Sequence, residues 1–328
     1  MAQFWLACGS PVISGIPNIT YLPSRKEKLR ILDGRSAEHS SSYPFVVAVM
    51  KWSSRSEMWL PSCVGIILSK FRILTACHCI ARLSGDSIKY YKPDWLHIIA
   101  GSNSFRLRSS LGQKKDVHTT VAHPLCALSG KIVVNDCGMI YIKSELRFTQ
   151  DVRPVKLSSY DPAGLKLMLQ EYMKSGVQCQ TVGWGATQYR YNNPSVHSEI
   201  LRITDLKMVT SEKCHTTFCT SSNANFICHH DLERANQICA VSTSRSSPCT
   251  GDSGGPLVCN GYVFGIFSWS ESCHRDYPAI FTNILLMIES VGEGGIERRS
   301  WWESNGGLAD ADSPLIIHIL LIMVPIAL

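Results

Sequence analysis

Short runs of hydrophobic residues recur along the chain, separated by polar residues, glycine and proline. The runs are four to eight residues long and rich in Val and Ile: PFVVAVM (44–50), GIILS (65–69), LHIIAG (96–101), KIVV (131–134), MIYI (139–142), PLVC (256–259) and YVFGIFSW (262–269). Runs of this length bounded by turn residues are typical of β-strands. Many short strands predict an all-β sandwich or barrel between residue 31 and residue 292. NILLMIESV (283–291) is the best helix candidate and predicts a short C-terminal helix.

The two ends of the chain depart from this strand pattern. Residues 1–30 contain three prolines and little periodicity, which indicates a leader or pro-segment. This segment also contains Asn18-Ile19-Thr20, an acceptor site for N-glycosylation. Residues 293–305 resemble a stalk, and residues 306–328 end in the uncharged apolar run PLIIHILLIMVPIAL.

That apolar run has 15 residues, whereas a membrane-spanning helix needs about 20. Small residues (SNGG, 304–307) and a polar spacer (LADADS) precede it, and this order is typical of a glycolipid (GPI) attachment signal. Ser304 and Asn305 are the candidate attachment residues. A buried helix or a short membrane span is the alternative. We therefore expect a protein on the extracellular face of the plasma membrane, or a secreted one.

Cysteine usage and charge narrow the function classes. Fourteen cysteines favour an oxidising compartment, where disulfides persist. The net charge is +6, and the densest basic run, RKEKLR (25–30), includes a glutamate and no aromatic residue, so no nucleic-acid partner is expected. Cys77-His78-Cys79 is too tightly spaced for a tetrahedral zinc site, which uses spacings such as C-x₂-C. We expect neither a metal nor another cofactor.

The most unusual stretch is SPCTGDSGGPLVC (247–259). Glycines around Ser253 allow backbone conformations that a Cβ forbids and permit close approach to a substrate carbonyl. A nucleophilic serine needs a base for its proton and N–H groups directed at the developing oxyanion. A Gly-x-Ser turn can supply two such N–H groups, so Ser253 is a candidate nucleophile.

Five motifs together resemble the trypsin/chymotrypsin family of serine proteases: GDSGGPLVC, LTACHC, NDCGMIYI, VGWG and FSWSESC. The resemblance covers residues 31–292 and follows the family's order of His, Asp and Ser. It implies a protease domain of two packed six-stranded antiparallel β-barrels with the active site between them. The implied machinery is Ser253 as nucleophile, His78 as base, Asp136 orienting His78, the N–H groups of Gly251 and Ser253 as oxyanion hole, and Ser268 supporting Asp136.

The resemblance also implies how the protein is activated and what it cleaves. Cleavage after Arg30 by a separate trypsin-like protease would free the Ile31 amine to pair with Asp252. The implied substrate pocket contains Ser247, Ser270, Ala279 and Trp269. Ser247 replaces the aspartate of trypsin-like members, and the side chains of Ser270 and Ala279 narrow the pocket. Cleavage after small or medium uncharged residues is therefore expected.

Four disulfides are implied by the resemblance: Cys63–Cys79, Cys179–Cys259, Cys214–Cys239 and Cys249–Cys273. Six cysteines remain unassigned: Cys8, Cys77, Cys126, Cys137, Cys219 and Cys228. Cys219 and Cys228 lie close enough in sequence to close one loop. Cys77 and Cys137 adjoin His78 and Asp136, so either a bridge or two buried free thiols would fit.

Two functions fit these features. The first is an active, membrane-anchored serine endopeptidase that acts on proteins or peptides and is subject to protein inhibitors. The second is a catalytically weak or inactive surface binding or adhesion protein on the protease scaffold. The complete set of His78, Asp136, Ser253 and the Arg30–Ile31 junction favours the first. Departures such as Cys77, where the family usually has alanine, leave the second open.

Overall fold

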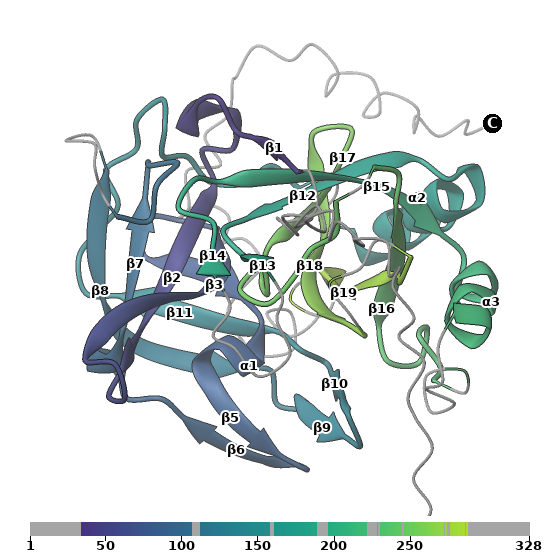
Figure 1. Cartoon of the computed structure of the whole chain (residues 1–328), viewed down its shortest axis with the longest axis horizontal. Helices are drawn as coiled ribbons and strands as arrows, with labels where there is room; N and C mark the ends of the chain where they lie inside the picture. Colours follow the sequence, from purple (N-terminus) through teal and green to yellow (C-terminus); the bar gives the residue numbers. More distant parts are fainter. Residues whose placement is uncertain are drawn as a thin grey trace, which may run out of the picture.

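Figure 1 shows the computed structural model of the chain, which describes residues 34–106, 112–157, 161–188, 196–221, 228, 230–244, 246–271, 273, 276–285 and 287. Two closed β-barrels stand side by side, the N-terminal one on the left in Figure 1 and the C-terminal one on the right. This architecture confirms the predicted all-β fold of two six-stranded antiparallel barrels.

The N-terminal barrel is closed in the order β11-β4-β3-β2-β7-β8. Its strands are β2 (Val46–Ser53), β3 (Met58–Ile67), β4 (Arg72–Thr75), β7 (Leu96–Ala100), β8 (Gln113–Ala122) and β11 (Gly138–Ile142). The first residues of β2 are buried on both faces of the strand. Val47 and Val49 pack in the barrel interior, whereas Ala48 and Met50 pack with Trp184 and other residues of the C-terminal barrel. The uninterrupted apolar run of β2 therefore reflects a strand covered on both sides.

The C-terminal barrel has the strand order β15-β12-β17-β18-β19-β16, and a further β15–β16 pairing closes it. Its strands are β12 (Gln178–Gly183), β15 (Arg202–Val209), β16 (Gln237–Ser242), β17 (Pro256–Cys259), β18 (Tyr262–Ser270) and β19 (Ala279–Asn283). The short strand β1 (Arg35–Ser36) pairs with the first two residues of β15, ahead of the residues that pair with β16, and brings the start of the described chain onto this barrel.

Three two-stranded hairpins extend from the barrels: β5 (Ala81–Ser84) with β6 (Ser87–Tyr90), β9 (Ala127–Ser129) with β10 (Ile132–Val134), and β13 (Ala186–Gln188) with β14 (Val196–His197). The first two contact each other through the N–H of Leu128, which donates to the carbonyl of Gly85 at 2.9 Å. The β9–β10 hairpin also reaches the C-terminal barrel, because the Gln237 side-chain amide donates to the Val133 carbonyl at 2.9 Å. These two hairpins extend downward in Figure 1.

The described helices are few: α1 (Cys77–Ile80), α2 (Pro162–Ser175), α3 (Ser211–Ser221) and the 3₁₀ turns η1 (Ser40–Ser42) and η2 (Pro93–Trp95). The hydrophobic pattern did not predict α2 or α3. The expected helix at 283–291 lies mostly outside the described residues, but Leu285 and Met287 are helical and Asn283 ends β19. None of the helices in the described part of the chain has the length and apolar character of a membrane span.

Candidate active site

His78 and Asp136 lie at the same end of two paired strands. His78 belongs to α1, which follows β4, and Asp136 stands two residues before β11. Gly138 of β11 pairs with Thr75 of β4, so the chain brings the two side chains together where these strands meet α1. The His78 Nδ1 lies 2.7 Å from the Asp136 Oδ2, and the His78 backbone N–H donates to the Asp136 Oδ1 at 3.1 Å.

The Asp136 carboxylate is fully buried and receives a further hydrogen bond from the other barrel. The hydroxyl of Ser268, on β18, donates to the Asp136 Oδ2 at 2.6 Å. Burial would raise the pKa of Asp136, but the His78 charge and hydrogen bonds from His78 and Ser268 outweigh burial and lower that pKa. Asp136 is therefore held as a carboxylate.

The pKa of His78 is raised by the same pair. Burial opposes protonation of the imidazole, but the negative charge of Asp136 and its hydrogen bond favour the imidazolium more strongly. The positive charge of Lys51 acts in the opposite direction and moderates the increase. The imidazole is thereby prepared to accept a proton beside a fixed carboxylate.

Ser253 stands in a tight turn that touches both barrels. Its carbonyl accepts a hydrogen bond from the Val64 N–H of β3 at 2.8 Å, and the next N–H, of Gly254, donates to Phe267 of β18 at 2.7 Å. Gly251 and Gly254 have φ values of +99° and +82°, which favour glycine. A side chain on Gly254 would also collide with the Val64 carbonyl. The GDSGG sequence is thus required by backbone geometry at the point where the barrels meet.

The buried Asp252 side chain occupies a socket formed in part by the VGWG motif. Its carboxylate accepts hydrogen bonds from the N–H groups of Gly185, at 2.7 Å, and Cys249, at 2.9 Å. A Cβ at Gly183 or Gly185 would collide with this carboxylate, so the two glycines make the room for it. Burial raises the pKa of Asp252 to about 6, although the two N–H donors oppose the increase.

A cavity of about 250 Å³ opens beside Ser253 on the side of the C-terminal barrel. Its described lining consists of Pro248, Cys249, Thr250, Ser253, Phe267, Ser268, Trp269, Ser270, Glu271 and Cys273. Trp269 and Ser270 of the predicted pocket are in this lining. Ser247 and Ala279 are buried next to it: Ser247 precedes Pro248, and Ala279 pairs with Ser270 across β18 and β19. Glu271 is the one charged residue of the lining, and it is exposed.

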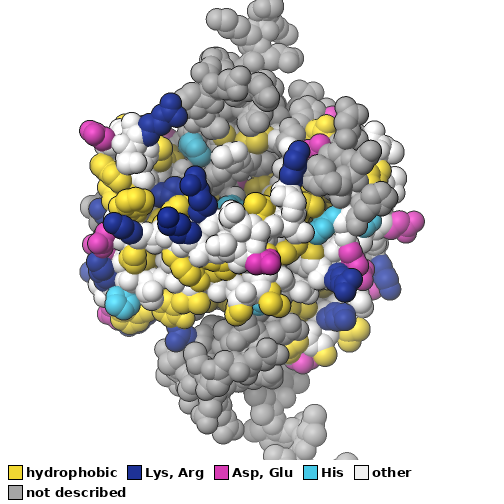
Figure 2. Space-filling model, turned by 90° about the horizontal axis from the view of Figure 1, so that it is seen from below, with side chains coloured by type: hydrophobic (Ala, Val, Ile, Leu, Met, Phe, Trp, Pro, Cys, Tyr) yellow, Lys and Arg dark blue, Asp and Glu magenta, His cyan; other side chains and the backbone are white. Residues whose placement is uncertain are grey.

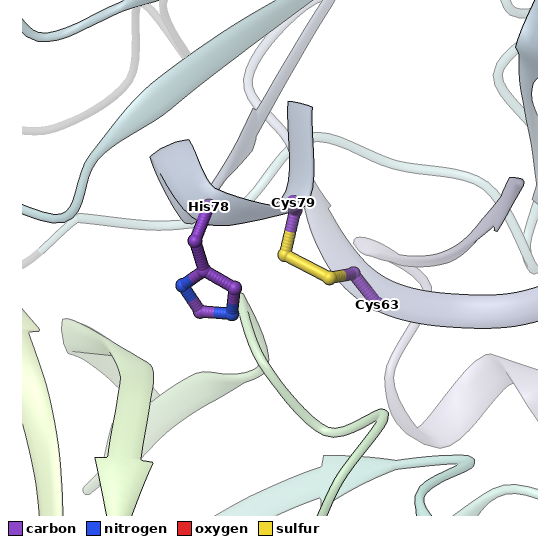
Figure 3. Close-up of side chains that lie close together, drawn as sticks. All are labelled: Cys63, His78 and Cys79. Atoms are coloured by element: carbon purple, nitrogen blue, oxygen red, sulfur yellow. A yellow bond between two sulfur atoms is a disulfide. The ribbon is translucent and has the colours of Figure 1, made fainter. Parts of the chain in front are cut away.

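The histidine–cysteine cluster at 77–79 is explained by disulfides. Cys63, His78 and Cys79 approach one another closely enough to suggest a metal site. Figure 3 shows, however, that the sulfurs of Cys63 and Cys79 are bonded to each other, with the imidazole of His78 beside the bridge. Disulfide sulfurs are not thiolates, the form in which cysteine binds metals. The bridge instead fixes α1 against β3.

Six disulfides lie within the described residues. Four have the partners that the resemblance implies, and the Cys219–Cys228 bridge closes the loop suggested from spacing. Cys77 differs from both alternatives considered for it, because it is bonded to Cys126. Cys137 is a buried free thiol in the core cluster that includes Ile66 and Leu74. Burial, with the nearby Asp136 charge, raises the pKa of Cys137 to about 12, so this thiol stays neutral.

The structure also brings to the site residues that the sequence analysis did not single out. The ring of His197 lies against Gly251, since a Cβ on Gly251 would be 2.6 Å from the His197 Nδ1. The hydroxyl of Thr75 donates to the Val64 carbonyl at 2.7 Å and supports the strand that holds Ser253. No local sequence signal identifies either contact, because both join segments far apart in the chain.

A family model described as Trypsin matches residues 31–288. The chain belongs to the trypsin family. It is therefore a serine protease of the endopeptidase class, as the motifs predicted. Among similar proteins, this trypsin-family chain is 28% identical to trypsin alpha of Drosophila erecta over 261 residues, covering 78% of this chain and 86% of the relative. It is also 28% identical to kallikrein-1 of Mus musculus over 268 residues, with the same two coverages.

A solved structure of neuropsin, a serine protease expressed in the limbic system of mouse brain, has the same fold as this protease. It aligns with a TM-score of 0.57 at 22% identity, over 79% of this chain and 97% of neuropsin. Several predicted sites of this protease lie outside the described residues: Arg30, Ile31, Cys8, Asn18, Ser304 and Asn305.

Proposed function

We propose that this trypsin-family protease hydrolyses peptide bonds through Ser253, His78 and Asp136. The Ser253 Oγ attacks the substrate carbonyl while His78 takes the hydroxyl proton, giving an acyl-enzyme and, on transfer of that proton, a free leaving amine. A water molecule, deprotonated in turn by His78, then releases the acyl group and regenerates Ser253. Asp136 keeps the proton of neutral His78 on Nδ1, so Nε2 is free to accept the serine proton.

The N–H groups of Gly251 and Ser253 stabilise the oxyanion in this proposal. The positive φ of Gly251 is consistent with an N–H turned toward the cleft. The observation that supports the proposal most directly is the fully buried Asp136, shared by His78 of one barrel and Ser268 of the other. Burying a carboxylate is costly, and a role in orienting a base explains why the Asp136 Oδ2 accepts hydrogen bonds from both the His78 imidazole and the hydroxyl of Ser268.

A fluorophosphonate probe tests the proposed nucleophile. We expect the protein, after cleavage at Arg30, to become labelled covalently on Ser253, as located by peptide mass spectrometry. Ser253→Ala should remain unlabelled, and labelling should fall in His78→Ala because the serine loses its base. An unlabelled wild-type protein with intact disulfides would contradict the proposal and favour a non-catalytic surface binding protein.

We propose further that the chain is made as a zymogen. A trypsin-like protease of different specificity cleaves after Arg30, and the new Ile31 amine pairs with Asp252. Support comes from the Asp252 socket, in which burial raises the pKa to about 6 while two backbone N–H groups are already in place. A cation beside Asp252 would favour its charged form and stabilise the turn that contains Gly251 and Ser253.

The proposed preference before the cleaved bond is a small or medium uncharged residue. The cavity beside Ser253 is small, and Phe267, Trp269 and Ser270 supply an uncharged lining, with Glu271 exposed at its edge. Protein or peptide substrates are expected, and protein inhibitors would occupy the same cleft. An uncharged pocket is poorly suited to cleavage after Arg30, so the activating protease is a separate enzyme.

The proposed membrane attachment is a glycolipid anchor at Ser304 or Asn305, following removal of the apolar tail. On transfected cells, we expect phosphatidylinositol-specific phospholipase C to release the protein into the medium. A matched chain ending at residue 303 should be secreted into the medium without phospholipase treatment. Protein that stays on the cells after phospholipase treatment, under conditions that release a known anchored protein, would contradict the anchor.

A further inference from the structure

Charge is distributed unequally between the two barrels. The described residues within 34–157 include 16 Lys and Arg but only 8 Asp and Glu, whereas those within 161–287 include 6 and 10, respectively. Figure 2 shows the largest group of Lys and Arg side chains on its left, the side of the N-terminal barrel, beside hydrophobic side chains. One half of the molecule is thus distinctly basic.

Within this basic half, three lysines lie over aromatic rings. The distances from Nζ to the ring centroid are 4.4 Å for Lys51 and Tyr91, 5.6 Å for Lys92 and Trp95, and 5.7 Å for Lys114 and Trp59. Contact with a ring face holds an ammonium group in place without neutralising it. Among the residues that the structure describes, no carboxylate lies within ion-pair distance of these three lysines. Their charges remain available to an anionic ligand.

Lys51 is the one of the three whose charge acts on the proposed catalytic histidine. Val49 of β2 pairs with Cys63 of β3, and Lys51 follows on the same face of β2, because strand side chains alternate. Its partner Tyr91 donates its N–H to the Ile80 carbonyl at 3.0 Å, directly after Cys79. Lys51 is therefore beside the end of α1 and the Cys63–Cys79 bridge. Its lowering effect on the pKa of His78 is consistent with this position.

This location is on the leaving-group side of the cleft. The cavity for the residue before the cleaved bond is lined by Trp269 and Ser270, on the C-terminal-barrel side of Ser253. His78 of the N-terminal barrel is not among the described residues of that lining and, in the proposed mechanism, gives its proton to the leaving amine. In that mechanism, the residues that follow the cleaved bond are expected to extend past His78 and the Cys63–Cys79 bridge toward Lys51.

We propose that Lys51 selects substrates with an aspartate or glutamate within the first three residues after the cleaved bond. The proposal rests on the proposed function and adds a preference on the side of the cleft opposite the pocket. The acidic side chain would meet a lysine that is already positioned over Tyr91 and has no carboxylate partner among the described residues, so little ordering is needed to form the pair. Lys92, which follows Tyr91, extends the basic surface for substrates with more than one acidic residue.

Paired peptides test this preference. The peptides are identical except for aspartate or asparagine at the first, second or third position after the cleaved bond, and the ratio of their kcat/KM values is measured. We expect the best position to favour aspartate by about 2- to 5-fold, the range of an exposed ion pair. The ratio should fall to about 1 in Lys51→Met, which keeps the apolar contact with Tyr91, and persist in Lys51→Arg.

Lys70→Met is the matched control. Lys70 is an exposed lysine of the same barrel, it pairs with Glu145, and it lies just before the start of β4, whereas α1 and His78 follow the end of that strand. Its ratio should equal the wild-type ratio. A wild-type ratio of 1 at all three positions, or an unchanged ratio in Lys51→Met, would overturn the proposal while leaving the proposed protease activity intact.

Binding to Ser253→Ala separates this proposal from the proposed function. Fluorescence anisotropy of the same labelled peptides requires no cleavage. Tighter binding of the aspartate peptide, lost in the Ser253→Ala, Lys51→Met double variant, supports the Lys51 site even if the wild-type protein cleaves neither peptide. Equal binding of both peptides by Ser253→Ala would overturn it.

Discussion

Replacing Asp136 by asparagine is expected to lower kcat about 10,000-fold, the size of loss established for this substitution in serine protease triads. The carboxylate accepts a hydrogen bond from the His78 Nδ1 at 2.7 Å, whereas the asparagine NH₂ would donate to the same nitrogen. The His78 proton would then move to Nε2, which could no longer accept the proton of Ser253. Steady-state kinetics on a peptide substrate measure the loss.

The pH profile gives this experiment a second readout. His78 must be neutral to act as a base, and Asp136 raises its pKa, so wild-type activity falls as the pH drops through that raised value. Without the carboxylate the His78 pKa falls, and the acidic limb of the residual activity should move to lower pH. Asp116→Asn, at an exposed position on β8, should keep both the rate and the profile. An Asp136→Asn variant within tenfold of the wild-type kcat would contradict the proposed role.

Two changes at the activation junction are expected to abolish activity for different reasons. Arg30→Gln should resist trypsin at residue 30 and remain inactive, because no Ile31 amine is released. Ile31→Asp should lack the apolar side chain that accompanies the amine toward Asp252, so cleavage would not produce activity. N-terminal sequencing establishes cleavage, and active-site titration with a fluorophosphonate measures competent sites.

The neighbouring change Arg25→Gln serves as the control, since it alters charge in the same segment without touching the junction. It should activate as the wild-type protein does. Full activity in either junction variant would show that Asp252 does not need the Ile31 amine, and the zymogen proposal would then be wrong.

The strands were predictable because their apolar runs are short and bounded by turn residues, and each of the seven quoted runs overlaps a strand. The helix α2 was missed although its ends are marked. Asp161 caps it through the Gly164 N–H, Pro162 begins it, and Gly176 ends it with φ +64°. Its buried face consists only of Leu165 and Leu169, so the hydrophobic pattern was weak where the capping residues were informative.

The positions of His78, Asp136 and Ser253 followed from motifs, but the partner of Cys77 did not. Proximity to the triad suggested either a bridge to Cys137, which directly follows Asp136, or two buried free thiols. Consecutive residues leading into a strand point in different directions, however, so while Asp136 faces His78, Cys137 packs in the core. Cys126, 49 residues from Cys77, reaches it only because the chain turns at the end of β8. Such a pairing depends on tertiary structure that spacing does not encode.

The hydrogen bonds at the centre of the molecule join one barrel to the other. The Val64 N–H binds the Ser253 carbonyl, and Ser268 binds Asp136 across the same boundary. Neither barrel alone contains a complete set of proposed catalytic residues. The proposed catalytic rate therefore depends on the relative position of the two barrels. A small sliding of one folded barrel against the other would abolish activity before either barrel unfolds.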